Sequence, residues 1–96
     1  MERSEISRHE IEVLKVLSGN QTSWLSNAEI AARAQGVAPR TVRATTLKLV
    51  KAGVLDQAEV FPGHRFRLAD RAAQRNRGYF DRLHRAAEVF GVELTV

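Results

Sequence analysis

The chain has 96 residues, a formal net charge of +4 and no cysteine. Its length predicts one domain with a modest core and leaves too little chain to enclose a substrate cleft as well. The absence of cysteine excludes disulfide bonds and thiolate metal sites and is compatible with a reducing compartment.

The first predicted element is a helix that begins after Ser7. Ser7 and Glu10 have the spacing of a capping box, and Gly19 marks the expected end of the helix. Apolar residues fill so much of positions 11–17 that we expect this helix to be central to the core. Residues 22–25 then predict a short strand, with Trp24 as a packing residue.

Two helices joined by a tight turn are predicted next. Ser26 and Glu29 have the spacing of a second capping box, and Gly36 supplies the permissive backbone that a sharp turn requires. Pro39 suits the first position of the following helix, because a residue there needs no backbone N–H. That second helix is expected to run to about Ala52.

On a helical wheel, the second helix has one apolar face and one polar face. The polar face suits a DNA major groove, because Arg and Lys donate to guanine or to phosphates and a small Ala permits close approach. Leu47 also lies on this face, where it either packs on the following segment or contacts a thymine methyl group. The residues predicted to contact bases are Arg40, Thr41, Arg43, Ala44 and Lys48, with Lys51 on phosphate or in the minor groove.

A short hairpin follows Gly53. Residues 54–60 have strand-like content, residues 61–64 have turn chemistry, and residues 65–68 alternate with period two. This alternation predicts Phe66 and Leu68 on one face and two arginines on the other. Arg65 and Arg67 are expected to contact phosphates or a narrow minor groove. His64, at the tip, either contacts DNA beside them or is a plain turn residue.

The last predicted element is a helix that begins at Asp70, with a kink or a break at Gly78. Its apolar stripe is longer than a small domain readily covers, so two copies are expected to bury it in a two-fold homodimer. The alternative is that the helix folds back on its own domain. In either case we expect a single domain, with residues 1–69 as its core and residues 70–96 as a helical extension. The predicted dimer interface consists of Tyr79, Phe80, Leu83 and Phe90.

Positive charge is concentrated in the middle of the chain. Residues 33–85 contain twelve Lys or Arg against four Asp or Glu, whereas the segments on either side are acidic. Such a balance favours a nucleic-acid partner. His9, His64 and His84 do not have metal-ligand spacing, and no serine or threonine stands in a context that would activate it. We therefore expect no catalytic site, no metal and no cofactor.

Three segments carry a resemblance to a known family: Ala-Glu-Ile-Ala at 28–31, Arg-Thr-Val-Arg at 40–43 and Ala-Gly-Val-Leu at 52–55. With their surroundings they resemble the winged helix-turn-helix of bacterial MarR and ArsR regulators, over about half of the chain. The resemblance implies a mainly helical fold with a small β-hairpin wing, in which the helix from Arg40 to Lys51 is the recognition helix. Two features depart from the pattern: the wing is short, and Ala38 is a poor helix cap.

These observations together predict a dimeric regulator of transcription that binds specific double-stranded DNA and represses by occupying a promoter. No apolar stretch approaches the ~20 residues needed to cross a bilayer, and no signal peptide is present, so a cytoplasmic, nucleoid-associated location is expected. Two alternatives remain open at this point. One is a protein-interaction module, because winged helices also serve as docking domains. The other is an architectural or accessory DNA-binding factor of a mobile element.

Overall fold

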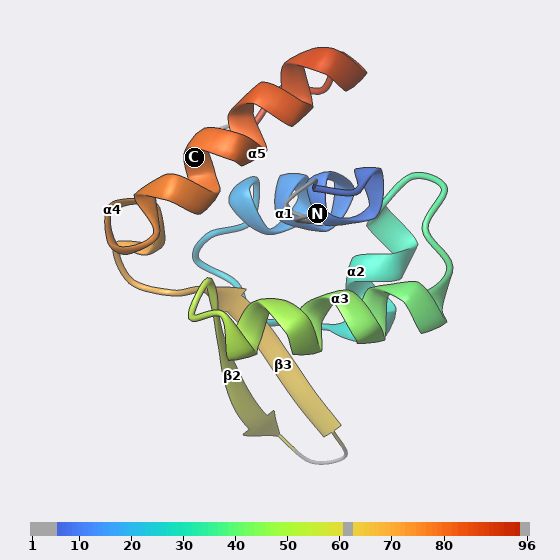
Figure 1. Cartoon of the computed structure of the whole chain (residues 1–96). Coiled ribbons are helices and arrows are strands. Elements are labelled where there is room, and N and C mark those ends of the chain that lie inside the picture. The colour runs from blue at the N-terminus through green and yellow to red at the C-terminus, as the bar shows by residue number, and fades with distance from the viewer. Residues whose placement is uncertain (1–5, 61–62, 95–96) are drawn as a thin grey trace.

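The structure is a computed structural model that describes residues 6–60 and 63–94. It contains five helices and three strands within those ranges (Figure 1). Their bounds are α1 Arg8–Ser18, β1 Leu25–Ser26, α2 Asn27–Arg33, α3 Pro39–Lys51, β2 Leu55–Val60, β3 Gly63–Leu68, α4 Ala72–Arg75 and α5 Arg77–Phe90.

The helix starts follow the local signals in the sequence. The Ser26 hydroxyl accepts from the Glu29 backbone N–H at 3.1 Å, and the Glu29 carboxylate accepts from the Ser26 N–H at 2.8 Å, so the second capping box is complete. At α1, Ser7 accepts from the Glu10 N–H at 3.3 Å, but the Glu10 side chain turns elsewhere. Pro39 opens α3 as predicted.

Helices α2 and α3 are joined by a turn in which Gly36 has a φ of +69°. A residue with a side chain would be strained in this left-handed conformation, so glycine suits the position. Gly53 has a φ of +81° and serves in the same way between α3 and β2. The chain therefore reverses sharply at both ends of α3, which places α3 beside α2 and at the base of the hairpin (Figure 1).

The three strands form an antiparallel sheet in the order β1-β3-β2. In its register Leu25 lies opposite Phe66, and Leu55 lies opposite Leu68. The first strand starts later than the predicted 22–25, because the backbone is still turning there: the Ser23 N–H donates to the Asn20 carbonyl at 3.1 Å. Gly63 and His64, predicted as turn residues, already belong to β3, while residues 61 and 62 lie outside the described residues.

Helix α1 lies at the centre of the core, as its apolar content predicted. It contacts α2, α3 and α5, and four of its side chains have no exposed surface: Ile11, Val13, Leu14 and Leu17. The other helices and the sheet each add apolar residues to the same cluster. Burial of this kind stabilises a small domain mainly through the hydrophobic effect.

The C-terminal segment differs from the single helix that the sequence predicts. Asp70 does not cap it, because Arg71 adopts a left-handed backbone with a φ of +56° before α4 begins. The break falls at Asn76 and not at Gly78, which lies inside α5. The Asn76 side chain stabilises the break by donating to the carbonyls of Gly53 at 3.3 Å and Ala72 at 3.1 Å.

Helix α5 folds back on α1, which corrects part of the predicted dimer interface. Phe80 is 3% exposed and Leu83 is fully buried, so both side chains fill the core of their own chain. Tyr79 is half-buried and packs edge-on against Phe80. Of the four predicted interface residues, only Phe90, at 43% exposure, keeps a large exposed apolar surface.

Candidate nucleic-acid interface

Helix α3 is anchored by one face and presents the other to solvent. Val42, Thr45, Thr46 and Leu49 are buried. The Thr46 hydroxyl lies 2.7 Å from the Asn27 side-chain oxygen and 3.1 Å from the Arg43 carbonyl, which ties α3 to the start of α2. The opposite face is exposed along its whole length and carries Arg40, Arg43, Ala44, Leu47, Lys48 and Lys51, with Thr41 half-buried at its edge.

An open groove of about 500 Å³ separates α3 from the hairpin. Arg43 and Leu47 line it from α3, and His64 and Gln57 line it from the two strands. Residues 26–28, at the start of α2, close one side. The fold thus brings the predicted base-contacting residue Arg43 and the predicted wing residue His64 to one concave surface.

Arg65 is held by an acidic partner that the sequence did not predict. Its guanidinium donates to the Glu29 carboxylate at 2.9 Å and to the Trp24 carbonyl at 3.4 Å. The backbone hydrogen bond from Ser26, together with the charge of Arg65, holds the pKa of Glu29 below its ordinary value. Arg65 therefore ties the hairpin to α2 while about a third of its side chain stays exposed.

Arg67 lies on the same face of β3 as Arg65 and stacks on Trp24. Its guanidinium carbon is 4.3 Å from the centre of the indole ring, a cation–π arrangement. Phe66, between the two arginines, is buried on the other face of the strand. The predicted alternation along this strand is therefore confirmed.

The tip side of the hairpin pairs a histidine with a carboxylate. The His64 ring nitrogen Nε2 lies 3.4 Å from the Glu59 carboxylate across the strand pair. Both side chains are exposed to solvent. A carboxylate at this place repels phosphate, so the basic character of the hairpin lies nearer its base, at Arg65 and Arg67.

Lys48 has a partner that turns it away from the hairpin groove. Its ammonium nitrogen lies 2.9 Å from one oxygen of Glu10 in α1, and the Tyr79 hydroxyl of α5 donates to the other oxygen at 2.7 Å. We call these three residues the Glu10 cluster. The Glu10 side chain is only 4% exposed. Burial, followed by the hydrogen bond to Glu10, raises the pKa of Tyr79 well above its usual range.

Sequence reasoning missed this cluster, because Glu10 already had a role there as a capping residue. A polar Tyr79 within the apolar stripe of α5 was the one available signal, since a buried phenol requires a hydrogen-bond partner. Nothing in the local pattern identifies that partner.

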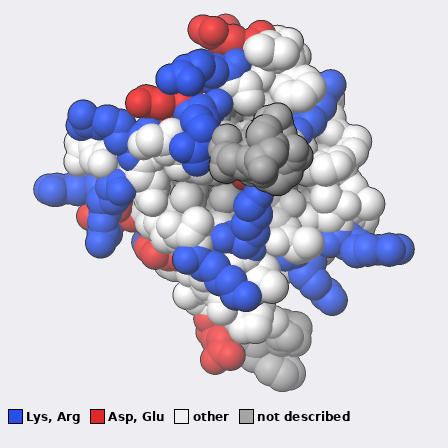
Figure 2. Space-filling model, in the orientation of Figure 1, with Lys and Arg blue, Asp and Glu red and all other residues white. Residues whose placement is uncertain are grey.

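The basic side chains are spread over the face that carries α3 and the hairpin. Figure 2 shows Lys and Arg projecting from several sides of this face. Helix α3 itself contributes three exposed basic side chains, those of Arg40, Arg43 and Lys51. Such a surface attracts a polyanion and steers its approach.

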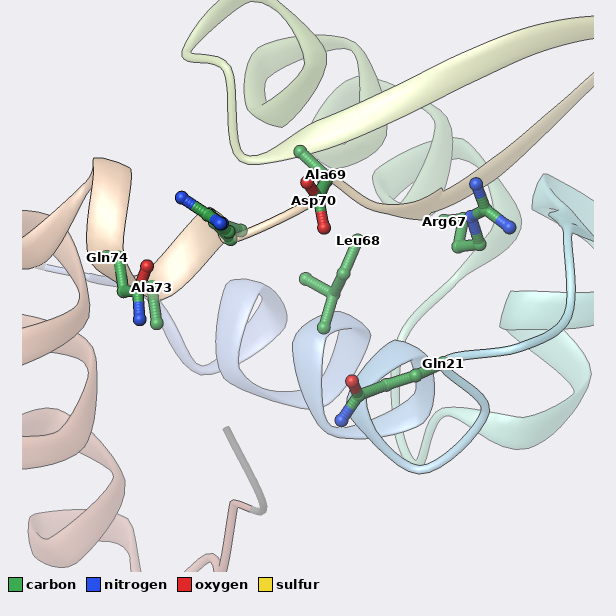
Figure 3. A pocket seen from close by; sticks show the side chains of 9 residues that line it. Gln21, Arg67, Leu68, Ala69, Asp70, Ala73 and Gln74 are labelled. Carbon is green, nitrogen blue, oxygen red and sulfur yellow. The ribbon is translucent and has the colours of Figure 1, made fainter.

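A second depression, of about 520 Å³, lies where β3 runs into α4 (Figure 3). Gln21, Arg67, Asp70 and Gln74 supply most of its polar groups. Asp70 is the only carboxylate that lines it, so it lacks the paired groups of an acid–base site. Among residues 6–60 and 63–94, no three His, Asp or Glu side chains gather where they could share a metal ion. No helix in those ranges is long and apolar enough to cross a membrane.

Comparison with known proteins identifies the fold. No protein-family model and no curated protein sequence matches the chain. Among solved structures, the chain is similar to the zinc-dependent MarR-family transcriptional regulator AdcR in its Zn(II)-bound state, with a TM-score of 0.54 and 23% identity. The match covers 92% of this chain but only 57% of the other. The predicted winged-helix fold is thereby confirmed.

Proposed function

We propose that the chain is a non-enzymatic regulator of transcription that binds specific double-stranded DNA through α3 and the hairpin. The observation that carries this proposal is the outward face of α3, where Arg40, Arg43 and Lys51 are exposed beside an open groove shared with the hairpin. The winged-helix fold of a MarR-family regulator supports it. Since a fold alone does not determine function, the chemistry of this face is the stronger argument.

In this proposal, α3 enters the major groove. Arg40 and Arg43 donate to base edges, with Thr41 and Ala44 close to the bases and Lys51 on phosphate. Lys48 is moved from the base contacts to the phosphate contacts, because Glu10 draws it toward α1.

The hairpin contacts the DNA backbone or the minor groove beside α3. Arg67 is the principal cation there, because its only described partner is the neutral indole of Trp24. Arg65 contributes less, since Glu29 already neutralises part of its charge. His64 lines the same groove as Arg43 and Leu47, where it can contact a phosphate or a base edge.

We further propose that two copies bind together. Phe90, at 43% exposure, is the residue of the predicted interface that remains substantially exposed, and Val89 beside it, at 83% exposure, adds to this apolar end of α5. A two-fold dimer would place two copies of α3 about 34–36 Å apart, one turn of DNA, so the operator would be an imperfect palindrome. A dimer that occupies a promoter in this way would act as a repressor.

The test is selection from a random double-stranded DNA library, with sequencing of the retained fraction at two salt concentrations. Salt weakens phosphate contacts more than base readout, so the two conditions separate the contributions. A palindromic motif that survives at the higher salt supports the proposal. Retention without a motif, lost with salt, would identify an architectural DNA-binding factor. No retention at either salt would refute DNA binding and favour a protein-docking module.

A further inference from the structure

Leu47 is an apolar side chain in the middle of the polar face of α3. It is 50% exposed, and the only other large hydrophobic side chains so described are Val89 and Phe90 at the end of α5. Its neighbours one turn away on the same face are Arg43 and Lys51, both exposed. An isolated exposed leucine is common on protein surfaces, so its meaning depends on what its surroundings offer.

The surroundings of Leu47 form the groove between α3 and the hairpin. Arg43 and His64 line this groove with it and supply donors, and Phe66 adds an apolar floor. The hairpin does not cover Leu47, since half of its side chain remains accessible. The sequence left two roles open for Leu47: packing on the hairpin, or contact with a thymine methyl group. Packing on the hairpin therefore explains only the buried half of this side chain.

The major groove contains one kind of apolar group on a base edge, the C5-methyl group of thymine. Ala44, one turn before Leu47, is small and exposed, so the backbone of α3 can approach the bases closely at this point. A leucine at such a position removes a thymine methyl from water, whereas it offers nothing to the polar edges of guanine, adenine or cytosine.

We infer that Leu47 is a specificity-determining residue that reads the C5-methyl group of a thymine. The inference rests on the proposed function, in which α3 lies in the major groove. It adds that the operator has a thymine at the position that faces Leu47, and that Arg43 contacts a neighbouring base or phosphate along the same groove. In a two-fold dimer, the same thymine recurs in each half-site.

The test replaces the thymines of the selected operator with deoxyuridine, one at a time. Deoxyuridine pairs with adenine as thymine does and lacks only the methyl group. Affinity is measured by fluorescence anisotropy. One position per half-site should show a loss of about fourfold, the effect expected for one methyl group removed from water. At that position, Leu47→Ala should bind the thymine and deoxyuridine duplexes equally well.

His84→Ala is the matched control, because it truncates an exposed side chain on α5 that lies outside both the groove and the proposed dimer contact. It should leave the ratio of thymine to deoxyuridine affinities unchanged at every position. The fluorescence of the single tryptophan, Trp24, checks that both variants remain folded. Since Leu47 is half-exposed, its truncation should leave the core intact.

The possible failures are distinct. If the wild-type chain binds a motif but no thymine in it is sensitive to loss of its methyl group, the inference about Leu47 is wrong and the proposed function stands. The same holds if Leu47→Ala keeps the wild-type discrimination. If the wild-type chain binds no duplex at all, both the proposed function and this inference are wrong.

Discussion

Removal of the Tyr79 hydroxyl tests whether the Glu10 cluster stabilises the fold. Tyr79 donates to a carboxylate at 2.7 Å, and the Glu10 side chain is 4% exposed, so water cannot readily replace the lost donor. A hydrogen bond to a charged group contributes about 1.5–3 kcal/mol. We therefore expect Tyr79→Phe to lower the free energy of unfolding by about 2 kcal/mol. In a domain of this size, that corresponds to a fall in Tm of about 8–16 °C.

The assay is urea unfolding followed by the fluorescence of Trp24, the only tryptophan. The dependence of the unfolding free energy on urea should not change, because the variant exposes the same surface on unfolding. The matched comparison is Tyr79→Phe in a Glu10→Gln background. There the acceptor is neutral, and the same change should cost only about 0.5–1.5 kcal/mol.

Two results would contradict this reasoning. A loss below about 0.5 kcal/mol in the wild-type background would place Tyr79 among ordinary surface positions. An equal loss in both backgrounds would show that the charge on Glu10 adds nothing to the hydrogen bond.

Four further predictions concern the charged and exposed residues. The raised pKa of Tyr79 means that the folded chain holds the phenol proton more tightly than the unfolded chain does, so the contribution of Tyr79 to stability should be fully present below about pH 10 and be lost as the pH rises further; an unfolding series across alkaline pH should show this loss in the wild type and not in Tyr79→Phe. The lowered pKa of Glu29 gives the opposite sign, with its contribution to stability present above the ordinary glutamate range and lost as the pH falls through the folded-state value; Glu29→Gln should reduce the loss of stability at acid pH, and an unchanged loss would show that neither the Ser26 hydrogen bond to this carboxylate nor its pairing with Arg65 stabilises the fold. In binding titrations, Arg43→Ala should lose about 1–3 kcal/mol of discrimination at one base pair, whereas Arg67→Ala should weaken all duplexes alike and reduce the salt slope by about one; equal losses on operator and random DNA for both variants would count against these roles. If the chain forms the proposed dimer, Phe90→Lys should convert it to monomer in light-scattering measurements, and a dimer that persists would show that this end of α5 is not the interface.

Several elements could be predicted from the sequence because their causes are local. The capping box at Ser26 and Glu29, the proline at the start of α3 and the left-handed glycine at 36 each act within about one helical turn. The alternation around Phe66 is equally local, since successive side chains of a strand point to opposite faces. Such signals can be read without knowing what lies beside them in space.

Other features depended on contacts between distant parts of the chain. The break in the C-terminal segment falls at Asn76 because its side chain reaches Gly53, 23 positions away, and this contact outweighs the helix-weakening tendency of Gly78. The burial of Phe80 and Leu83 within one chain depends on α1, which covers the stripe that the sequence left open to a second copy.

The sequence by itself thus determined where the first three helices begin, and which side chains of α3 and β3 share a face, because helix and strand geometry sets these relations within a few residues. Only the tertiary structure decided the partners of the charged groups. The Glu10 carboxylate accepts hydrogen bonds from Lys48, 38 positions away, and from Tyr79, 69 positions away. The Glu29 carboxylate accepts from Arg65, 36 positions away. The physical reason is that a charged side chain pairs with whichever counter-charge or donor the packed helices and strands bring within about 3 Å, and no local pattern encodes that distance.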